Sequence, residues 1–345
     1  MTEKEPLRVA VAGCHRMLLS DLTNHNFAAA FNAVPDTEIV AVFDHGDETR
    51  AEFVAFWRDT WGDIPAYGDY EQMLSEVNPD LICVATRQTM HADQIEAAVA
   101  SGVRGILCDK PLATSLREMD RIIAACENVP LAFGLDRRWS LPFLHLRETM
   151  EENVGSITAA VAFGLNNTIN HGCHLYDSLL GLLGDPDPVW VSGLVDDSDS
   201  GNPRQGVDPS SRAQVGFDNG LVAYITMDGG KGYSFEIVGD KGRISIPADG
   251  DEAYLRSANT NGIEALALPE KEGRWPEGPA IVRDLANAVR SGQRTACDTE
   301  HARRATEIGF AIHHSSNNGG ARVMVSEVER SLRIPSYPWG NEKPV

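Results

Sequence analysis

The sequence predicts an α/β protein with two domains, a doubly wound parallel sheet followed by an α+β domain on a largely antiparallel sheet. Three observations support this fold class. Strand-like and helix-like segments alternate over the first 135 residues, β-runs separated by turns follow from 189 to 246, and 345 residues exceed one typical core. We therefore expect one domain at residues 1–135 and a second at residues 136–345.

Short apolar runs mark the strands of the first domain. They lie at residues 7–12, 38–43, 81–85, 105–108 and 130–134, with a weaker short strand at 65–67. Helical patterns lie between several of them, for example at 91–100 and 116–126. This βαβ rhythm predicts parallel strands joined by right-handed crossovers.

A small or polar residue follows each of the five main strands. These residues are Gly13, Asp44, Thr86, Asp109 with Lys110, and Asp136. Because the carboxyl ends of parallel strands meet at one edge of an open sheet, where ligands bind, the pattern predicts a ligand crevice along that edge.

The second half of the chain has a different pattern. The expected elements are a helix at 140–152, a strand at 156–163, a helix at 171–183, β-runs at 189–195, 213–217, 221–227, 233–238 and 243–246, and helices at about 279–291 and 300–315. Turn signals separate the β-runs, which indicates a largely antiparallel sheet. Residues 196–212 read as a long polar loop, and the aromatic tail from Ile334 is expected to pack on the body.

Composition excludes several classes of partner. The net charge of −20 disfavours nucleic acid and anionic membranes, and no apolar run approaches the roughly 18 residues of a membrane span. The six cysteines form no CxxC pair, as expected of reduced core thiols in a cytoplasmic protein. The N-terminus lacks the blocks of a signal peptide. We expect neither a nucleic-acid nor a membrane partner.

Lys110 stands at the carboxyl end of a predicted strand, between Asp109 and Pro111. The proline restricts Lys110 to extended geometry. A lysine fixed there can donate a proton or hold a substrate, and the alternative is a surface lysine in an ordinary turn.

The turn after the first strand departs from the dinucleotide-binding pattern G-x-G-x-x-G. Gly13 supplies the first glycine, but His15 and Leu18 stand at the second and third positions. Phosphate donors would then be the N–H groups of the following helix, together with His15 or Arg16. The alternative is a plain strand–helix turn.

Three further residues suit a nucleotide. Asp44 can bind ribose hydroxyls and would repel a 2′-phosphate, or it can serve as a helix N-cap. Thr86 would allow close approach of a ring or ribose. His91, at the start of a helix, is either a cofactor contact or a local hydrogen-bonding residue.

In the second domain, Asn170, His174, Asp177 and Gly181 share one helical stripe if the helix includes all four. These residue types suit a cleft better than a solvated face, and a structural histidine is the alternative. His171, His174 and Asp177 lack specific zinc-site spacing, so we expect no metal.

The segment after Asp136 joins two arginines to an aromatic residue. Arg137, Arg138 and Trp139 lie near the expected domain boundary. They suit a substrate with hydroxyl or carboxylate groups. A salt-bridged linker is the alternative.

Taken in order, these motifs resemble the Gfo/Idh/MocA oxidoreductases, the family of glucose–fructose oxidoreductase and inositol dehydrogenase. The matching motifs are Asp109-Lys110-Pro111 (usually Glu-Lys-Pro in the family), Ala85-Thr86 with His91, Asp136 to Trp139, Gly172-x-His174-x-x-Asp177, and Glu236 to Gly242. They span nearly the whole chain.

The resemblance implies a nicotinamide-binding Rossmann domain and a substrate-binding domain whose open sheet pairs subunits as a homodimer or homotetramer. The reaction would move hydride between a carbinol of a sugar, sugar derivative or cyclitol and nicotinamide, with NAD preferred to NADP. Lys110 and His174 would handle the hydroxyl proton, and the Lys110–Pro111 bond is often cis in the family. Asn170 replaces the family's frequent aspartate.

We therefore predict two sets of site residues. The cofactor set comprises Gly13, His15, Arg16, Asp44, Thr86, His91, Asp109 and Lys110. The substrate set comprises Lys110, Arg137, Arg138, Trp139, Asn170, His174 and Asp177, with Lys110, His174 and Asn170 as the catalytic group. Two alternatives remain: an enzyme that cleaves glycosides through transient oxidation by NAD, and a non-catalytic sensor or regulator.

Overall fold

The structure is a computed structural model that describes residues 5–18, 21–23, 25–196, 208–227, 232–258 and 262–335. Its contacts divide the chain into two compact units. The first comprises residues 1–113, 118–139 and 272–300, and the second comprises 114–117, 140–271 and 301–345. Residues 136–139 and 272–300 thus join the first unit. The division into domains at 135 stays a prediction.

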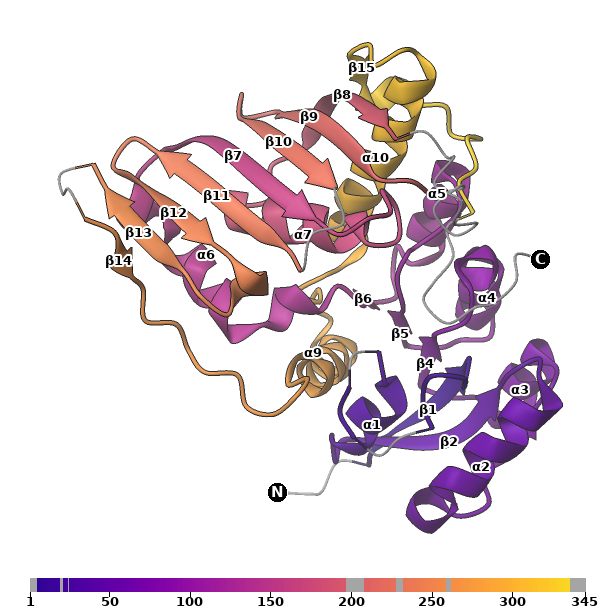
Figure 1. The fold of residues 1–345 in the computed structure, drawn as a ribbon. Helices are drawn as coiled ribbons and strands as arrows, with labels where there is room; N and C mark the ends of the chain where they lie inside the picture. The colour runs from indigo at the N-terminus through magenta and orange to yellow at the C-terminus, as the bar shows by residue number, and fades with distance from the viewer. Residues whose placement is uncertain are drawn as a thin grey trace. The chain divides into compact units, whose positions relative to one another are not determined.

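The first unit contains a six-stranded sheet in the order β3-β2-β1-β4-β5-β6, with every pair parallel (Figure 1). The strands are β1 (Leu7–Ala12), β2 (Thr37–Phe43), β3 (Ala66–Tyr67), β4 (Leu81–Val84), β5 (Gly105–Cys108) and β6 (Leu131–Phe133). The chain order reverses between β1 and β4, the switch point of a Rossmann sheet. The predicted doubly wound sheet is confirmed.

The helices of this unit include one from far along the chain. They are α1 (Phe27–Asn32), α2 (Asp47–Trp61), α3 (Tyr70–Val77), α4 (Gln88–Ala100), α5 (Leu116–Ala125), the 3₁₀ turn η1 (Asp136–Trp139) and α9 (Glu277–Ser291). A Cβ on Gly105 in β5 would lie 2.5 Å from Val289 and 3.2 Å from Leu285 of α9. The glycine therefore permits α9 to pack against this strand.

The second unit is built on a nine-stranded sheet in the order β14-β13-β12-β11-β7-β10-β9-β8-β15. Its strands are β7 (Ile157–Gly164), β8 (Pro188–Val195), β9 (Ser211–Phe217), β10 (Val222–Met227), β11 (Ser234–Gly239), β12 (Gly242–Ile246), β13 (Tyr254–Ser257), β14 (Glu264–Ala265) and β15 (Val323–Met324). Among the described strands of this sheet, only β7 and β10 pair in parallel. The mostly antiparallel sheet is confirmed.

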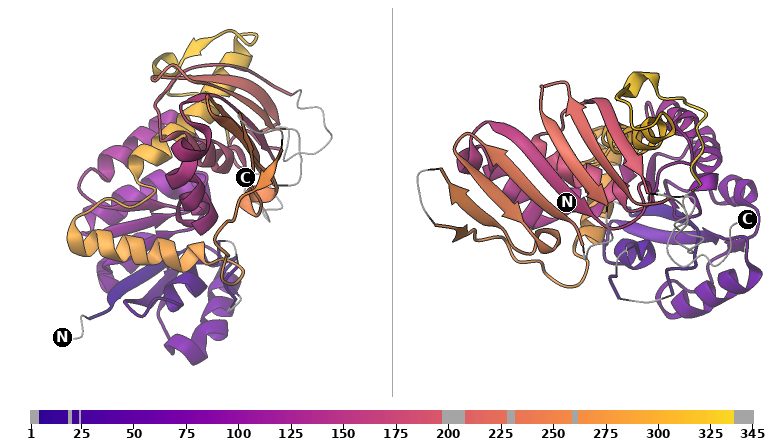
Figure 2. Two further views of the ribbon diagram at one scale, coloured as in Figure 1. Left: turned by 90° about the vertical axis from the view of Figure 1, so that its left-hand side faces the viewer. Right: turned by 45° about the horizontal axis from the view of Figure 1, so that its top comes forward.

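Three helices, α6 (Leu141–Val154), α7 (Gly172–Leu183) and α10 (Thr299–Asn317), lie on one face of this sheet, and no helix of the described residues covers the other face (Figure 2). Every residue of α7 except Gly181 is buried. The helix begins at Gly172 with His171 as its N-cap, so Asn170 lies in the preceding turn. The expected stripe is correct for His174 and Asp177, and it was wrong to include Asn170.

Two expectations fall largely outside the described residues. Residues 197–207 of the polar loop and 336–345 of the aromatic tail are not described, whereas residues 211 and 212 belong to β9. Within the described part of the chain, no helix is both long and apolar enough to cross a membrane.

Candidate functional site

Gly13 marks the switch point of the parallel sheet. Its φ is +94°, and a Cβ there would lie 2.5 Å from the carbonyl oxygen of Ala85 and 2.8 Å from the amide nitrogen of Thr86. Only glycine fits this backbone and this approach. The carboxyl ends of β1 and β4 thus meet where a doubly wound sheet holds its ligand.

The segment between β1 and α1 differs from the expected tight turn. The helix begins only at Phe27 and has 6 residues, and the Asn26 side chain caps it by accepting from the Ala29 amide at 3.2 Å. This cap engages the Ala29 amide. The expectation that the helix offers N–H groups to a phosphate stays a prediction for its remaining first amides, alongside His15 and Arg16 of the loop.

That loop buries two side chains and turns two others outward. Cys14 and Met17 are buried, and the Met17 carbonyl accepts from Trp57 Nε1 at 2.7 Å. Burial raises the pKa of the Cys14 thiol, so it stays neutral. His15 is exposed and Arg16 half-buried, the placement a phosphate donor requires.

Asp44 connects the end of β2 to this loop. Its Oδ2 accepts from the Cys14 amide at 2.9 Å and its Oδ1 from the Gly46 amide at 3.0 Å. The N-cap of α2 is Gly46, so the N-cap alternative for Asp44 is wrong. A half-buried carboxylate at this edge opposes a 2′-phosphate.

Thr86 and His91 stabilise the next turns. The hydroxyl of Thr86 donates to Gln94 Oε1 at 2.5 Å. The ring nitrogens of His91 face the carbonyls of Leu112 at 3.1 Å and Thr86 at 3.2 Å, and the ring is fully buried. Burial lowers the pKa of His91. This geometry fits the local hydrogen-bonding alternative better than direct cofactor contact.

The turn after β5 holds Lys110 in a polar setting. The Lys110–Pro111 peptide bond is cis, and both Asp109 and Lys110 are buried. Asp109 Oδ1 accepts from the Lys110 amide at 2.8 Å and lies 2.8 Å from Nδ1 of His25. Burial alone would raise the pKa of Asp109, but the charges of His25, Lys110 and Arg16 outweigh it and hold that pKa well below its usual range.

In the second unit, the predicted catalytic residues Asn170 and His174 lie at the start of α7, and the predicted substrate residue Asp177 lies further along it. Asn170, His174 and Asp177 are all buried, and the His174 ring lies 6.1 Å from that of Tyr233. His171, by contrast, bonds through Nδ1 to the nearby carbonyl of Asn166. A buried polar group this close to a helix start suits a substrate site and equally a structural network.

Asp208 fixes the backbone of this segment. Its oxygens accept from the amides of Ile169 at 2.8 Å and Asn170 at 2.9 Å, and its side chain is fully buried. His313 Nε2 lies 3.7 Å from the same carboxylate, too far for a hydrogen bond. The sequence did not reveal Asp208, because it lies in a segment that we read only as polar loop.

The residues of η1 have structural partners within the first unit. Arg137 pairs with Asp136 at 3.0 Å, and Trp139 Nε1 donates to Asp284 of α9 at 3.0 Å. Trp275 Nε1 donates to the other oxygen of Asp136 at 3.1 Å. For Arg137 and Trp139, these contacts favour the alternative of a salt-bridged linker over a substrate contact. Arg138 is buried.

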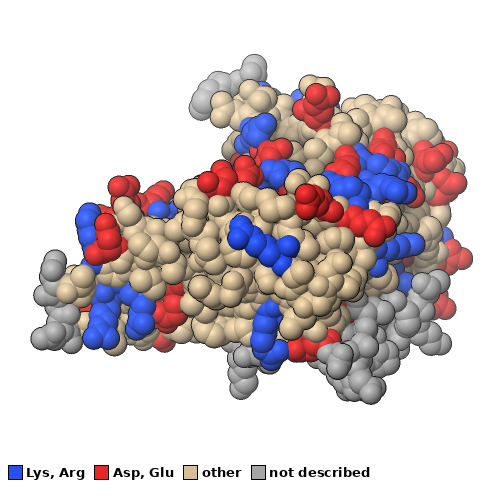
Figure 3. Space-filling view, turned by 90° about the horizontal axis from the view of Figure 1, so that it is seen from above, with Lys and Arg blue, Asp and Glu red and all other residues tan. Residues whose placement is uncertain are grey.

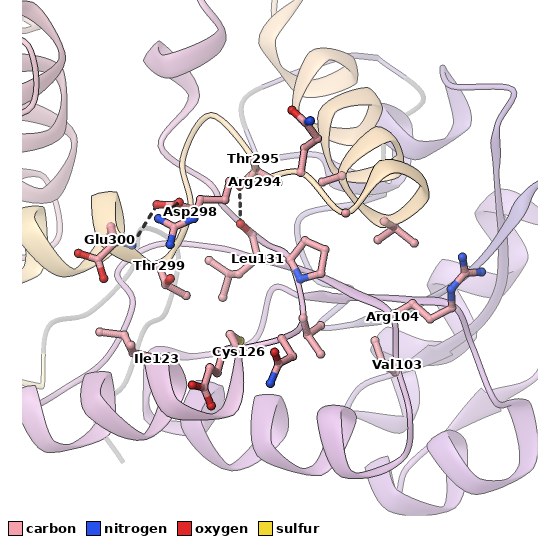
Figure 4. A pocket seen from close by; sticks show the side chains of 18 of the residues that line it. Val103, Arg104, Ile123, Cys126, Leu131, Arg294, Thr295, Asp298, Thr299 and Glu300 are labelled. Carbon is pink, nitrogen blue, oxygen red and sulfur yellow. Dashed lines mark hydrogen bonds and ion pairs between the residues drawn. The ribbon is translucent and has the colours of Figure 1, made fainter.

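A cavity of about 980 Å³ lies elsewhere in the first unit (Figure 4). Its wall includes residues that precede β5 and β6, so it faces the amino ends of these strands. Arg294 pairs with Asp298 at 3.2 Å, and Thr295 donates to the Leu131 carbonyl at 2.5 Å. None of the predicted site residues lines it. Among the described residues, no three His, Cys, Asp or Glu side chains form a group that could hold a metal ion.

Comparison with protein families gives two matches. A model described as the oxidoreductase family, NAD-binding Rossmann fold, matches residues 7–135. A model described as the oxidoreductase family, C-terminal alpha/beta domain, matches residues 162–325. Both belong to one family and together cover most of the chain.

Individual proteins show the same relationship. D-xylose 1-dehydrogenase (NADP(+)) 2 of Haloferax volcanii is 25% identical over 80% of this chain and 89% of its own length. D-glucoside 3-dehydrogenase of Escherichia coli is 26% identical over 52% of this chain and 55% of its own. Levoglucosan dehydrogenase, solved with NADH and levoglucosan, superposes with a TM-score of 0.77 at 18% identity, covering 94% of this chain and 100% of that one.

Proposed function

The chain belongs to the Gfo/Idh/MocA oxidoreductases, NAD(P)-dependent dehydrogenases that act on CH–OH groups, and we propose that it oxidises or reduces a sugar, sugar derivative or cyclitol with NAD. The observation that carries this proposal is the buried Lys110, fixed by Asp109 at the carboxyl edge of the parallel sheet. The relatives of this chain that are named as sugar dehydrogenases support a sugar as the substrate class.

The residues at the sheet edge fit a dinucleotide. Gly13 lets the ends of β1 and β4 approach closely at this edge, because a Cβ there would lie 2.5 Å from the Ala85 carbonyl oxygen. Arg16 supplies a donor for the phosphates and Asp44 an acceptor for ribose hydroxyls. When bound, the nicotinamide ring supplies the hydride acceptor or donor.

The chain's own residues handle the proton. Oxidation of a carbinol requires the hydroxyl proton to leave, and a positioned lysine or histidine can accept it. We assign this task to Lys110 and His174, as the family resemblance implies. Asn170 and Asp177 orient the substrate hydroxyls, and Asn170 itself cannot take a proton. Arg138 is a further substrate contact.

NAD is the preferred cofactor in this proposal. The Asp44 carboxylate accepts N–H bonds from the Cys14 and Gly46 amides, which fix its orientation at this edge. Arg50, the nearest cation on α2, donates to the Asp44 carbonyl and pairs with Asp47. The Arg50 guanidinium is therefore already held by these two partners. Because the Haloferax relative is named for NADP(+), the preference of this chain for NAD over NADP has to be measured directly.

The face of the nine-stranded sheet that no described helix covers is proposed as the subunit interface of a homodimer or homotetramer. Phe163, Leu194 and Tyr224 are exposed large apolar side chains on its strands. Seen from above, much of the surface is uncharged, with a few Lys and Arg side chains within it (Figure 3). Light scattering should show an oligomer that Tyr224→Lys weakens. A monomeric wild type would refute this part of the proposal.

All six cysteines are free and buried, which supports the cytoplasm as the proposed compartment. Small-molecule substrates remain the proposed partners.

One experiment tests the function directly. A panel of sugars, sugar acids and cyclitols is incubated with NAD or NADP, and reduced nicotinamide is read by its absorbance. We expect net NADH formation with at least one member. Glycoside cleavage without net NADH would indicate transient oxidation instead. Cofactor binding without any turnover would favour a regulator, the alternative to which Asn170 and the departure from the glycine motif point.

A further inference from the structure

His25 occupies an unusual place in the loop between β1 and α1. Its φ is +65°, in the left-handed region that residues other than glycine rarely adopt. Such a conformation persists when the surroundings hold it. Here the imidazole Nδ1 lies 2.8 Å from Oδ1 of Asp109, beside the turn that carries Lys110.

Aromatic side chains fix the plane of this imidazole. The ring centroids of His25 and Phe27 are 6.0 Å apart, edge to face, and those of His25 and Trp275 are 6.3 Å apart. Trp275 is buried and donates from Nε1 to Asp136, which follows β6. The position of the imidazole is thus determined from two sides.

Asp109 Oδ1 has two partners, the His25 ring and the Lys110 amide. This sharing fixes the rotamer of Asp109 and the backbone of Lys110 together. The side chain of Asp109 is one methylene shorter than that of the glutamate usual in the family. Its carboxylate therefore stays close to the end of β5, and His25 contacts it there.

The other ionisable groups that face Asp109 complete the charge balance. Arg16 and Lys110 are positive, while His91, Cys83 and Cys108 lie on the adjoining elements. Burial raises the pKa of both thiols and lowers that of His91, so these three groups are neutral. Asp109 is thus the negative charge of this group, with His25 in direct contact.

We propose that His25 is a positioning residue for Lys110, acting through the Asp109 carboxylate and connecting the cofactor-facing loop to the turn that carries the catalytic lysine. This inference rests on the proposed function. A residue that holds the lysine should change kcat far more than substrate KM or NADH affinity, because binding contacts remain in place.

The test compares two substitutions at one position. His25→Asn keeps an N–H donor near the site of Nδ1 and tolerates the left-handed backbone, but it removes the ring and the charge. His25→Ala removes the donor as well. We expect His25→Ala to lower kcat by between about tenfold and about a hundredfold, with partial rescue in His25→Asn, and NADH affinity within threefold of wild type in both. His145→Asn on α6 is the matched control.

A second readout does not depend on turnover. Carbon NMR of aspartate-labelled protein follows the Asp109 carboxyl, identified by the signal missing in Asp109→Asn. The pKa of Asp109 should be higher in both His25 variants than in wild type, because a contacting positive charge is removed.

The outcomes separate this inference from the proposed function. If wild type neither binds NADH nor turns over, the proposed function fails. If wild type is active but His25→Ala keeps kcat within twofold and the Asp109 titration does not move, the positioning role is wrong. If NADH affinity falls in step with kcat, His25 is a cofactor contact and the positioning role is again wrong.

Discussion

Substituting alanine for Gly13 tests whether the switch point is as tightly closed as the structure indicates. The new Cβ would lie 2.5 Å from the Ala85 carbonyl oxygen and 2.6 Å from its carbon, with φ at +94°. Backbone strain of this kind costs about 1–3 kcal/mol, and overpacking adds about 1–3 kcal/mol. We expect the free energy of unfolding to fall by about 2–6 kcal/mol and NADH binding to weaken.

Gly102 provides a matched control for this substitution. Its φ is +91°, but a Cβ there would meet nothing within 4 Å. Gly102→Ala should therefore show the strain cost alone, and urea unfolding of the two variants isolates the steric cost. Equal destabilisation of the two variants would refute the close approach of β1 and β4. Unchanged NADH affinity in Gly13→Ala would refute its role in the cofactor site.

Three further predictions concern the reacting groups and acid stability. Lys110→Ala should lower kcat by on the order of 10²–10⁴-fold, and a change within threefold would remove it from catalysis. His174→Asn should alter the pH profile of kcat/KM, and Asn170→Asp should move the same profile; unchanged profiles would contradict both roles. Because the folded-state pKa of Asp109 is depressed, its stabilisation is complete at neutral pH and is lost as pH falls below about 4. The difference in unfolding free energy between wild type and Asp109→Asn should shrink over that range, whereas a constant difference would contradict it.

Local signals predicted much of the fold. The strands at 7–12 and 105–108 match β1 and β5, because uninterrupted apolar runs between turn signals define buried parallel strands. The short strands β13, β14 and β15 were not predicted, because segments of two to four residues carry little periodicity, and β3, equally short, was predicted only as a weak strand. The packing of α9 in the first unit was not foreseen either, since its helical pattern does not specify which sheet it contacts.

The candidate site shows the same limit. The places of Gly13, Asp44 and Lys110 at strand ends were predictable because each lies one or two residues after a strand, while their roles stay predictions. His25 and Asp208 were not, because their importance arises from contacts with Asp109 and Asn170, far away in the sequence. The start of α1 at Phe27 was not predicted, because it depends on the Asn26 cap and not on a glycine motif.

The measurement that most directly tests the central claim is a titration of NADH and NADPH against intrinsic tryptophan fluorescence, with Asp44→Ser as the comparison variant. We expect NADH to bind at least tenfold more tightly than NADPH, a difference of about 1.4 kcal/mol, and Asp44→Ser to narrow it. Tighter binding of NADPH would refute only the role of Asp44. The absence of saturable binding of either nucleotide at millimolar concentration would contradict the assignment of this chain as an NAD-dependent dehydrogenase.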